Sequence, residues 1–491
     1  MSRNRYGLRF VLALACCGGA CFGEEPSPPA SAQQAPPDRP VLVGNVFPHM
    51  TVTAPGVRSD SETGIGAMIP WADRLWAVGY VAHIRGDGIG LYEIGADLSF
   101  KKHPESVTGT FANRLVHWDS KQAIIGPHVI DAAGNVRAFA ELAKHRLTAT
   151  ARHLVDPKNK VYFLTMEGLL FEADVNTLET TKLADLVAEL KIPKGAQPHF
   201  KGAFSAQGRL VVANNTYEEP EFLGERAGGR LAEWDGQAWT VLEENPFIEV
   251  SGKQNPVAGG RYGNTLFAVG WDRASVILRV LHGGEWRRYR LPKGGQSWDH
   301  TWNTEWMRIR EVQTERYLMD AFGIFYDLPP MVYGGNVWGI RPIANHLRIC
   351  PDMVTWRGLL VLAGDQTDNA VGQPQSNFWF GNIDDLWRWG KPGGWGAVWW
   401  DQAVEAGSVS DPFLMTGFDK KVLHLSYAAK EDVTFTVEVD FLGTGAWKTY
   451  RQITVPAEGY AHHEFPDAYS AHWVRVRADR ACRATASFAY N

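Results

Sequence analysis

The stretch RHLVDPKNKVYFLTMEGLLFEADVNTLET, residues 152–180, carries the pattern that decides the fold. It opens on basic residues and a turn, continues as the apolar run KVYFLT, and then alternates as LLFEAD before an acidic turn. Runs of β-branched and aromatic residues bounded by Gly, Pro, Asn and Asp are typical of short strands joined by tight turns. The stretch therefore predicts consecutive antiparallel strands.

The same pattern recurs along the chain at a spacing of about 40 to 60 residues, the period of propeller blades. The chain of 491 residues also holds 50 Gly and 20 Trp, which suits strands and turns better than helices. Only LADLVAEL, residues 183–190, predicts a short helix. We predict an all-β fold with a β-propeller of about seven blades over residues 41–400, and a stack of β-sandwiches is the alternative. Further copies of the pattern lie at residues 64–81, 113–139, 199–244, 259–291, 308–328 and 347–390.

The pattern changes after GKPGGWGAVWW, residues 390–400. Segments such as KKVLHLSYA and VTFTVEVDFL are short alternating strands without the blade pattern. Such strands predict two sheets that each bury one face. We therefore expect a C-terminal β-sandwich at residues 401–491.

The first residues predict export. Residues 1–23 combine three arginines with the short apolar run FVLALACC, as in a signal peptide, and lipidation at Cys21 is the alternative. Residues 24–40 are rich in Pro, Ala and Ser and predict a flexible linker. No later segment is long and apolar enough to span a membrane. We expect a periplasmic or extracellular protein, in which a lipid anchor remains an alternative.

The charge balance bears on the partner. The chain has 49 Lys and Arg against 54 Asp and Glu, a net charge of -5, and removal of residues 1–23 makes it more negative. A mildly acidic chain argues against a nucleic-acid partner. Cys350 and Cys482 lie far apart in the sequence and are expected to be two single thiols, although a disulfide between them is an alternative. The oligomeric state stays open.

Basic and imidazole side chains recur at the blade openings. The first strand of each blade lines the axis of a propeller, so these side chains converge there. Buried cations are costly without a counter-charge, which predicts a cationic axial pocket for an anionic ligand. The candidates for substrate binding are Arg114, Arg152, Lys201, Arg261, Trp302, Arg308, His346 and Arg348, and the candidates for catalysis are His153, His199, His300 and Glu305.

The segment WDHTWNTEW, residues 298–306, predicts the chemistry of the pocket. Tryptophan faces suit sugar rings, with Trp302 as part of the wall. His300 and Glu305 supply an imidazole and a carboxylate for proton transfer, while Arg and Lys can neutralise a uronate or sulfate. The expected function is cleavage of glycosidic bonds in acidic oligosaccharides or polysaccharides, by hydrolysis or by β-elimination.

The architecture resembles the seven-bladed propellers among secreted bacterial polysaccharide lyases and glycoside hydrolases. The resemblance covers residues 41–400, and it implies an axial pocket in which His, Tyr and Arg carry the reaction. No motif matches residue by residue, so no catalytic position is carried over. The wider pattern is also similar to a family of exported bacterial β-propeller proteins whose function is uncharacterised.

Two other functions stay open. Four histidines begin four segments and could meet on the axis as metal ligands, which would resemble the iron site of propeller-type dioxygenases. No cofactor is certain, although a divalent metal ion would suit this alternative. A propeller is also a common rigid binding platform, so a glycan-binding protein without catalysis is the third reading. The metal set would be His153, His199, His300 and His346.

Overall fold

The computed structural model describes residues 45–51, 63–81, 89–194, 197–216, 228–253, 264–295, 305–329, 332, 336–366 and 377–491. Strands and turns dominate these residues, and the prediction of an all-β fold is confirmed. No helix in the described part of the chain has the length and apolar character needed to cross a membrane. The short helices are α1 (Leu186–Glu189), η1 (Leu142–Lys144) and η2 (Ile383–Arg388).

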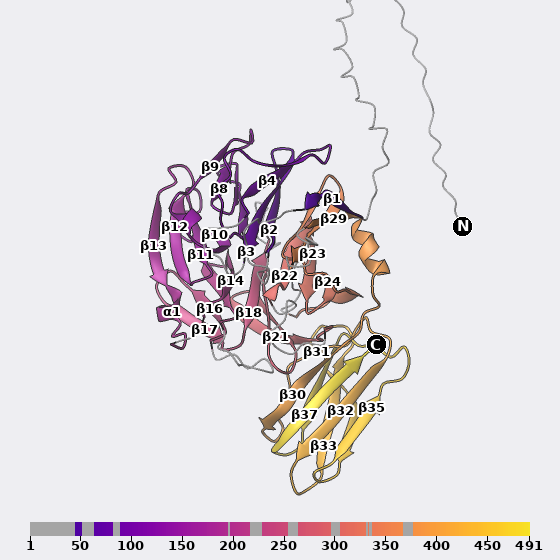
Figure 1. Cartoon of the computed structure of the whole chain (residues 1–491). Coiled ribbons are helices and arrows are strands. Elements are labelled where there is room, and N and C mark those ends of the chain that lie inside the picture. Colours follow the sequence, from indigo (N-terminus) through magenta and orange to yellow (C-terminus); the bar gives the residue numbers. More distant parts are fainter. Residues whose placement is uncertain are drawn as a thin grey trace, which may run out of the picture. The chain divides into compact units, whose positions relative to one another are not determined.

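Seven sheets follow one another along the described part of the chain, and Figure 1 shows several of their first strands near the middle of this part. The first sheet contains β2 (Thr63–Trp71), β3 (Arg74–Val81), β4 (Leu91–Ile94) and β5 (Phe100–Lys102), and the second contains β6 (Arg114–His117), β7 (Gln122–Ile125), β8 (His128–Ile130) and β9 (Val136–Ala138). The third contains β10 (Leu147–Arg152), β11 (Lys160–Thr165), β12 (Leu169–Asp174) and β13 (Thr180–Asp185). The fourth contains β14 (Phe200–Ala206), β15 (Arg209–Asn214), β16 (Arg230–Trp234) and β17 (Trp239–Glu243). The fifth sheet begins with β18 (Phe247–Gly252), β19 (Leu266–Trp271), β20 (Val276–His282) and β21 (Glu285–Leu291). The sixth contains β22 (Arg308–Gln313), β23 (Arg316–Ala321), β24 (Ile324–Leu328) and β25 (Arg341–Asn345). The seventh contains β26 (Met353–Trp356), β27 (Leu359–Ala363), β29 (Asn377–Gly381) and β1 (Asn45–Thr51).

The first strands of these sheets form a closed ring. Each of β2, β6, β10, β14, β18, β22 and β26 lies beside the next, and β26 lies beside β2. The ring is closed again further out, because β1 pairs antiparallel with β29 and so supplies the outer strand of the last sheet. The short strand β28 (Asp365–Gln366) also pairs with β2. This arrangement is a β-propeller, as predicted.

Tight hairpins join several of the strand pairs. Phe322–Gly323 connects β23 to β24, and both residues have positive φ, 51° and 74°. Arg357–Gly358 connects β26 to β27 in the same way, with φ of 49° and 82°. Positive φ at both central residues matches the right-handed twist of the flanking strands. The two-residue turns fix the register of each strand pair.

The cores lie between neighbouring sheets. One apolar cluster joins β10–β12 to β14–β16, and another joins β15 and β16 to β18–β20. Further clusters join β23–β25 to β26–β29, and β2–β4 to β27 and β29. A strand between two such cores buries both faces, which explains the continuous apolar runs in the sequence.

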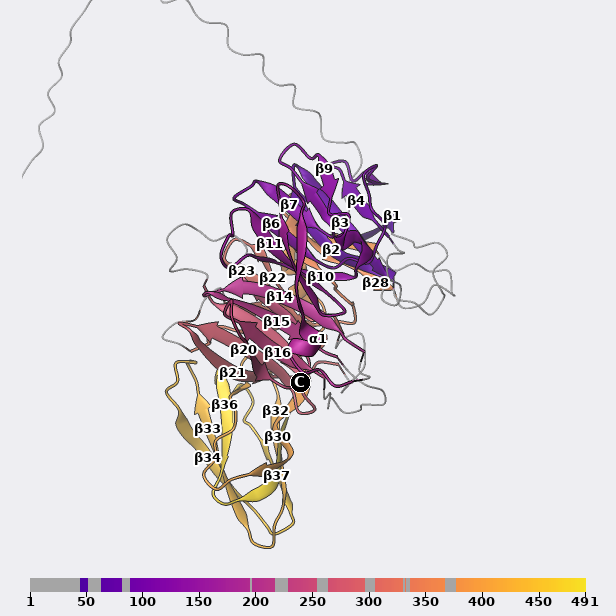
Figure 2. The same ribbon diagram turned by 90° about the vertical axis from the view of Figure 1, so that its left-hand side faces the viewer.

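The C-terminal residues form two groups of strands, of which the second continues the sheet that begins with β18. One contains β30 (Gly394–Val404), β37 (Cys482–Tyr490), β32 (Lys421–Ala428) and β35 (Tyr460–Glu464), and the other contains β31 (Phe413–Leu414), β36 (Trp473–Ala478), β33 (Val433–Asp440) and β34 (Lys448–Val455). Alternate residues of β32 and β37 are buried, as in sheets with one face against a core. Figure 2 shows β33, β34 and β36 in one layer and β30, β32 and β37 in the other.

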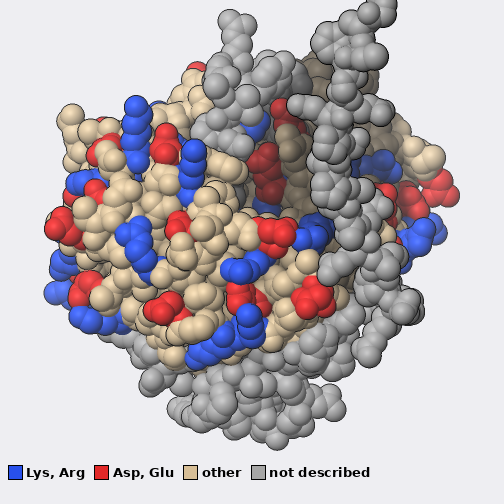
Figure 3. All heavy atoms as spheres, turned by 90° about the horizontal axis from the view of Figure 1, so that it is seen from above, with Lys and Arg blue, Asp and Glu red and all other residues tan. Residues whose placement is uncertain are grey.

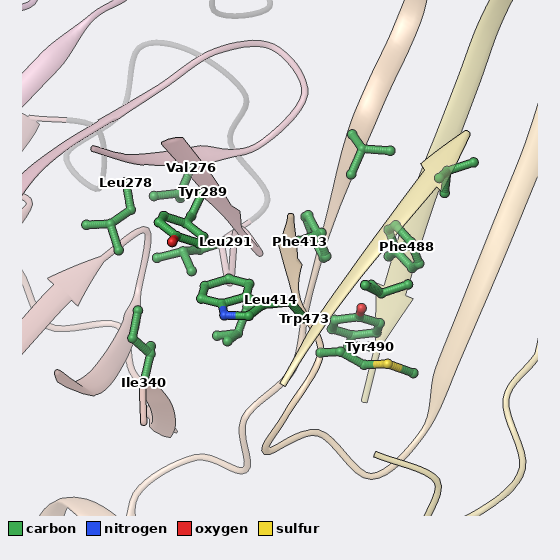
Figure 4. Close-up of a cluster of buried hydrophobic side chains, with 14 of the residues drawn as sticks. Val276, Leu278, Tyr289, Leu291, Ile340, Phe413, Leu414, Trp473, Phe488 and Tyr490 are labelled. Atoms are coloured by element: carbon green, nitrogen blue, oxygen red, sulfur yellow. The ribbon is translucent and has the colours of Figure 1, made fainter. Parts of the chain in front are cut away.

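The C-terminal sheets share a core with the propeller. Strand β31 pairs in parallel with β21 at Phe413 and Arg290. One apolar cluster runs from β19–β24 into β31–β37, and its aromatic members include Tyr289, Trp473 and Phe488 (Figure 4). The Trp473 indole Nε1 also donates a hydrogen bond to the Val337 carbonyl at 2.7 Å. The predicted boundaries at residues 23, 40 and 400 remain predictions.

Candidate functional site

The first strands enclose a narrow polar cavity of about 40 Å³. This is about three times the roughly 10–15 Å³ that a cavity needs to hold one water molecule. The charged residues on its wall come from four different sheets. They are Arg114, Lys201, Glu249, Arg308 and Arg310.

Asp352 is the centre of the charge network at one side of this axial cavity. It is fully buried just before β26. Its carboxylate lies 2.6 Å from Arg310 Nε and 2.7 Å from Arg114 Nε, and it accepts a hydrogen bond from the backbone N–H of Met68 at 2.7 Å. Burial alone would raise the pKa of Asp352, but the two guanidinium groups hold this pKa below its ordinary value. Asp352 therefore stays ionised.

Glu249 on β18 is the second acid of the network. Its Oε2 lies 2.9 Å from Arg310 Nη1 but 3.5 Å from Arg308 Nη1. Burial disfavours the charge of both arginines, yet Glu249 and Asp352 together raise the pKa of Arg310. Burial dominates for Arg308, whose pKa falls to about 10. Arg308 is therefore charged at neutral pH, and its short hydrogen bonds go to neutral carbonyls and not to an acid, from Nε to Pro351 at 2.6 Å and from Nη1 to Met307 at 2.8 Å.

A second ion pair lies where β14 meets the start of β22. Lys201 Nζ is 2.6 Å from Glu305 Oε2, and both side chains are nearly buried. The Asn215 amide donates a hydrogen bond to Glu305 Oε1 at 2.9 Å. Each oxygen of the carboxylate thus has a donor.

Trp306 stands beside this pair. The centroid of its ring lies 4.7 Å from Arg308 Cζ and 5.5 Å from Lys201 Nζ. Such distances permit attraction between a cation and the aromatic face. The ring of Tyr80 packs 4.7 Å away. The indole Nε1 of Trp306 is buried and has no hydrogen-bond partner among the described residues, and Trp306 lines a smaller cavity of about 10 Å³ together with Arg308 and Lys201.

Four of the predicted site residues meet here: Arg114, Lys201, Glu305 and Arg308. His199 lies next to them, because its backbone N–H binds Thr216 Oγ1 at 2.9 Å and its carbonyl accepts a hydrogen bond from the Asn215 N–H at 3.0 Å. The predicted candidates His300, Arg261 and Trp302 lie outside the described residues.

Two predicted histidines do not reach the cavity. His153 Nε2 lies 3.1 Å from Glu172 of β12, and its ring stacks on Tyr162. His346 Nε2 lies 3.1 Å from Asp320 of β23, and its ring stacks on Phe325 4.0 Å away. Each histidine is held within its own sheet, so the structure does not bring the two together.

The same holds for two predicted arginines. Arg152 Nη2 lies 2.8 Å from Asp119 Oδ2. Arg348 Nη2 donates hydrogen bonds to the Asn377 carbonyl and side chain at 3.2 and 3.0 Å. Burial lowers the pKa of Arg348. Both arginines bind groups away from the axial cavity, in positions where they hold loops and strands together.

Of the three acids at the site, the sequence predicted Glu305 but not Glu249 or Asp352. It predicted a pocket dominated by positive charge, whereas Glu249, Glu305 and Asp352 face Lys201 and three arginines. The signal for Arg310 was present in the sequence, because residues two apart on a strand share one face and Arg308 was already a candidate. Glu249 and Asp352 carried no such signal, since their partners come from distant sheets.

A metal site has little support in the described part of the molecule. Within the described ranges, no group of three or more His, Cys, Asp or Glu side chains is placed to hold a metal ion. The four-histidine alternative includes His300, which lies outside those ranges.

The described part of the face in Figure 3 carries charges of both signs. Lys and Arg side chains alternate with Asp and Glu over the described part of this face. An anionic ligand would therefore be attracted by the charged side chains at the cavity, and not by a positive electrostatic potential over this whole face.

No protein-family model and no curated protein matches the chain. Among solved structures, it is similar to the RRP9 WD40 repeats, with 9% identity over 69% of this chain and 99% of that chain and a TM-score of 0.41. It is also similar to the Cps50 (Swd1) β-propeller domain of Myceliophteria thermophila, with 10% identity over 67% and 98% of the two chains and a TM-score of 0.36. These likenesses are remote and say nothing about function.

Proposed function

We propose that this protein is exported and binds acidic oligosaccharides at the axial site beside Arg308 and Trp306. The observation that carries the proposal is the poor neutralisation of Arg308, whose ion pair with Glu249 is 3.5 Å long while burial lowers its pKa. A carboxylate or sulfate brought to this guanidinium would relieve the cost of its burial. The Trp306 indole N–H, which has no hydrogen-bond partner among the described residues, would be a second donor.

The size of the cavity limits what can enter it. About 40 Å³ accommodates an anionic substituent and not a sugar ring. The ring would remain at the mouth of the cavity, with its charged group directed toward Arg308. This geometry favours uronate or sulfate groups over neutral hydroxyls, because charge-assisted hydrogen bonds are the stronger ones.

Calorimetric titration with matched oligosaccharides tests the proposal. The parent protein is expected to bind oligouronates or sulfated oligosaccharides, and to bind neutral oligosaccharides of equal length at least about tenfold more weakly. Arg308→Gln and Trp306→Phe should each lower the affinity for the acidic ligand. Arg152→Gln, at a residue away from the cavity, should leave this affinity unchanged. Equal affinity for neutral and acidic ligands would overturn the proposal.

Cleavage of the bound saccharide is a second candidate, favoured by the Lys201–Glu305 pair. A carboxylate and an ammonium group 2.6 Å apart are a base and a proton donor in contact. Incubation with acidic polysaccharides followed by mass spectrometry would reveal products, and an unsaturated uronate would indicate β-elimination rather than hydrolysis. Glu305→Gln should abolish turnover while saccharide binding persists. If the saccharide binds but no products form, with or without added metal ions, the protein binds saccharides without cleaving them.

A further inference from the structure

A second cavity lies between the propeller and the C-terminal sheets. Its volume is about 170 Å³, roughly four times that of the axial cavity. Its aromatic wall consists of Tyr289 from β21 together with Trp447 and Trp473 from the C-terminal residues. Tyr289 and Trp473 pack with their ring centroids 4.7 Å apart (Figure 4). Concave sites with aromatic walls and a few polar groups are typical of small-ligand sites.

The loop after β33 is fixed in a shape that shields one side of this cavity. Asp440 accepts hydrogen bonds from the backbone N–H groups of Gly443 at 2.9 Å and Gly445 at 2.6 Å. Both glycines have positive φ, 74° and 84°, a conformation that favours glycine. Because the loop occupies both Asp440 oxygens, Asp440 shapes the cavity and is not free to bind a ligand.

The propeller holds the same loop from the other side. The Asn336 side chain donates a hydrogen bond to the Thr444 carbonyl at 3.0 Å. At the end of the loop, Arg475 Cζ stacks 4.1 Å from the centre of the Trp447 ring, and Arg475 is itself held by Glu438 at 2.7 Å. Trp447 is thus placed before any ligand arrives, which lowers the entropic cost of binding.

Two guanidinium groups line the cavity. Arg287 Nη1 donates a hydrogen bond to Asn336 Oδ1 at 3.2 Å, Arg287 also interacts with the Tyr289 side chain, and its Nη2 lies 3.9 Å from the exposed Glu285. Arg288 lies 3.4 to 3.8 Å from three carboxylates, which neutralise it, so Arg287 is the guanidinium that a ligand carboxylate would meet. Planar guanidinium donors match the geometry of a carboxylate.

We propose that this cavity binds one sugar unit bearing a carboxylate, stacked against Trp447 and paired with Arg287. The sugar class rests on the proposed function, whereas the requirement for a carboxylate and a flat apolar face rests on the cavity itself. The volume suits a single ring and not a chain. The cavity would hold the end of an acidic saccharide, or one of its side groups, at a distance from the axial site.

The test uses the full chain with glucuronate and glucose as ligands, followed by tryptophan fluorescence and calorimetry. Glucuronate should bind and glucose should bind at least about tenfold more weakly. Trp447→Ala and Arg287→Gln should each reduce glucuronate affinity by about tenfold or more. Trp387→Ala, at a tryptophan that is 48% exposed and does not line the cavity, should leave the affinity unchanged.

The variant Arg308→Gln at the axial site distinguishes a failure of this inference from a failure of the proposed function. If Arg308→Gln weakens acidic oligosaccharides while Trp447→Ala and Arg287→Gln change nothing, the cavity inference fails and the proposed function stands. If glucuronate binding depends on Trp447 and Arg287 but not on Arg308, the cavity inference stands without the axial site. Equal binding of glucose and glucuronate, or no binding of either, would overturn the cavity inference.

Discussion

Arg310 Nε lies 2.6 Å from Asp352 Oδ1, and this contact links β22 to the residue that precedes β26. The same carboxylate also holds Arg114 of β6 and the backbone N–H of Met68 in β2. One buried acid therefore ties four sheets of the ring together. Since β2 and β26 are the first strands of the first and last sheets, the contact lies at the point where the ring closes.

Replacement of Asp352 by Asn should destabilise the protein strongly. The substitution leaves the guanidinium groups of Arg114 and Arg310 without this counter-charge, and breaking a buried pair in this way costs about 3–5 kcal/mol. Urea unfolding at neutral pH measures the loss. The control is Asp73→Asn, because Asp73 and Arg357 form an ion pair whose side chains are 84% and 43% exposed and which should contribute less than about 1 kcal/mol. Equal effects of the two substitutions would show that the central network does not stabilise the ring.

Acidic pH should lower the free energy of unfolding because His128 takes up a proton only in the unfolded protein. Burial lowers the pKa of His128 to about 4, and the ring is held neutral because Nδ1 faces the Ile125 carbonyl at 3.1 Å while Nε2 accepts the Val107 N–H at 3.0 Å. Between an unfolded pKa of about 6.5 and the folded value, only the unfolded state takes up the proton, so stability falls as the pH falls through this window. The loss from this group is about 3 kcal/mol.

The measurement is the free energy of unfolding at a series of pH values between about 7 and 4. His128→Gln should flatten the pH dependence relative to the parent, although it lowers stability at neutral pH. His462→Gln, at an exposed histidine of β35, should leave the slope unchanged. A slope that does not respond to His128→Gln would contradict the assignment of this histidine as a buried neutral group.

The strands could be predicted from the sequence because each one is defined locally, by alternation and by turn residues. The helix at residues 183–190 was only partly right, since Ala184 and Asp185 pair with β12 and the helix begins only after the Asp185 cap. The pairing of β1 with β29 was not predicted, because it depends on how far the ring turns before it closes. Local patterns do not contain that information.

The residues of the candidate site were likewise predicted only in part. The blade openings predicted Arg114, Lys201 and Arg308, since a strand position can be read from local sequence. The partners of these cations could not be predicted in this way, because Asp352 lies 238 residues from Arg114. Recurrence along the sequence therefore located the positive charges and gave no indication of what neutralises them.

Trp473→Ala should uncouple the C-terminal sheets from the propeller. The substitution removes the contact with the Tyr289 ring and the hydrogen bond to Val337 from a core that both parts share. The expected cost is about 3–5 kcal/mol. Calorimetry should show a single transition for the parent and an earlier, separate transition of the C-terminal part for the variant. Trp387→Ala, at an exposed position, should keep one transition, and a single unshifted transition for Trp473→Ala would contradict the role of this joint.

Removal of β1 should open the ring. Strand β1 pairs with β29 from Asn45↔Phe380 to Thr51↔Asn377, and Met50 is fully buried in the core between the first and last sheets. Without β1, strand β29 becomes an unpaired edge, which invites association between molecules. A chain that starts at residue 52 should therefore unfold at lower urea concentration and aggregate, whereas a chain that starts at residue 41 should match the parent. A synthetic peptide of residues 45–51 should restore part of the lost stability of the shorter chain. If the chain that starts at residue 52 were as stable and as monomeric as the one that starts at residue 41, the closure through β1 would contribute nothing to the fold.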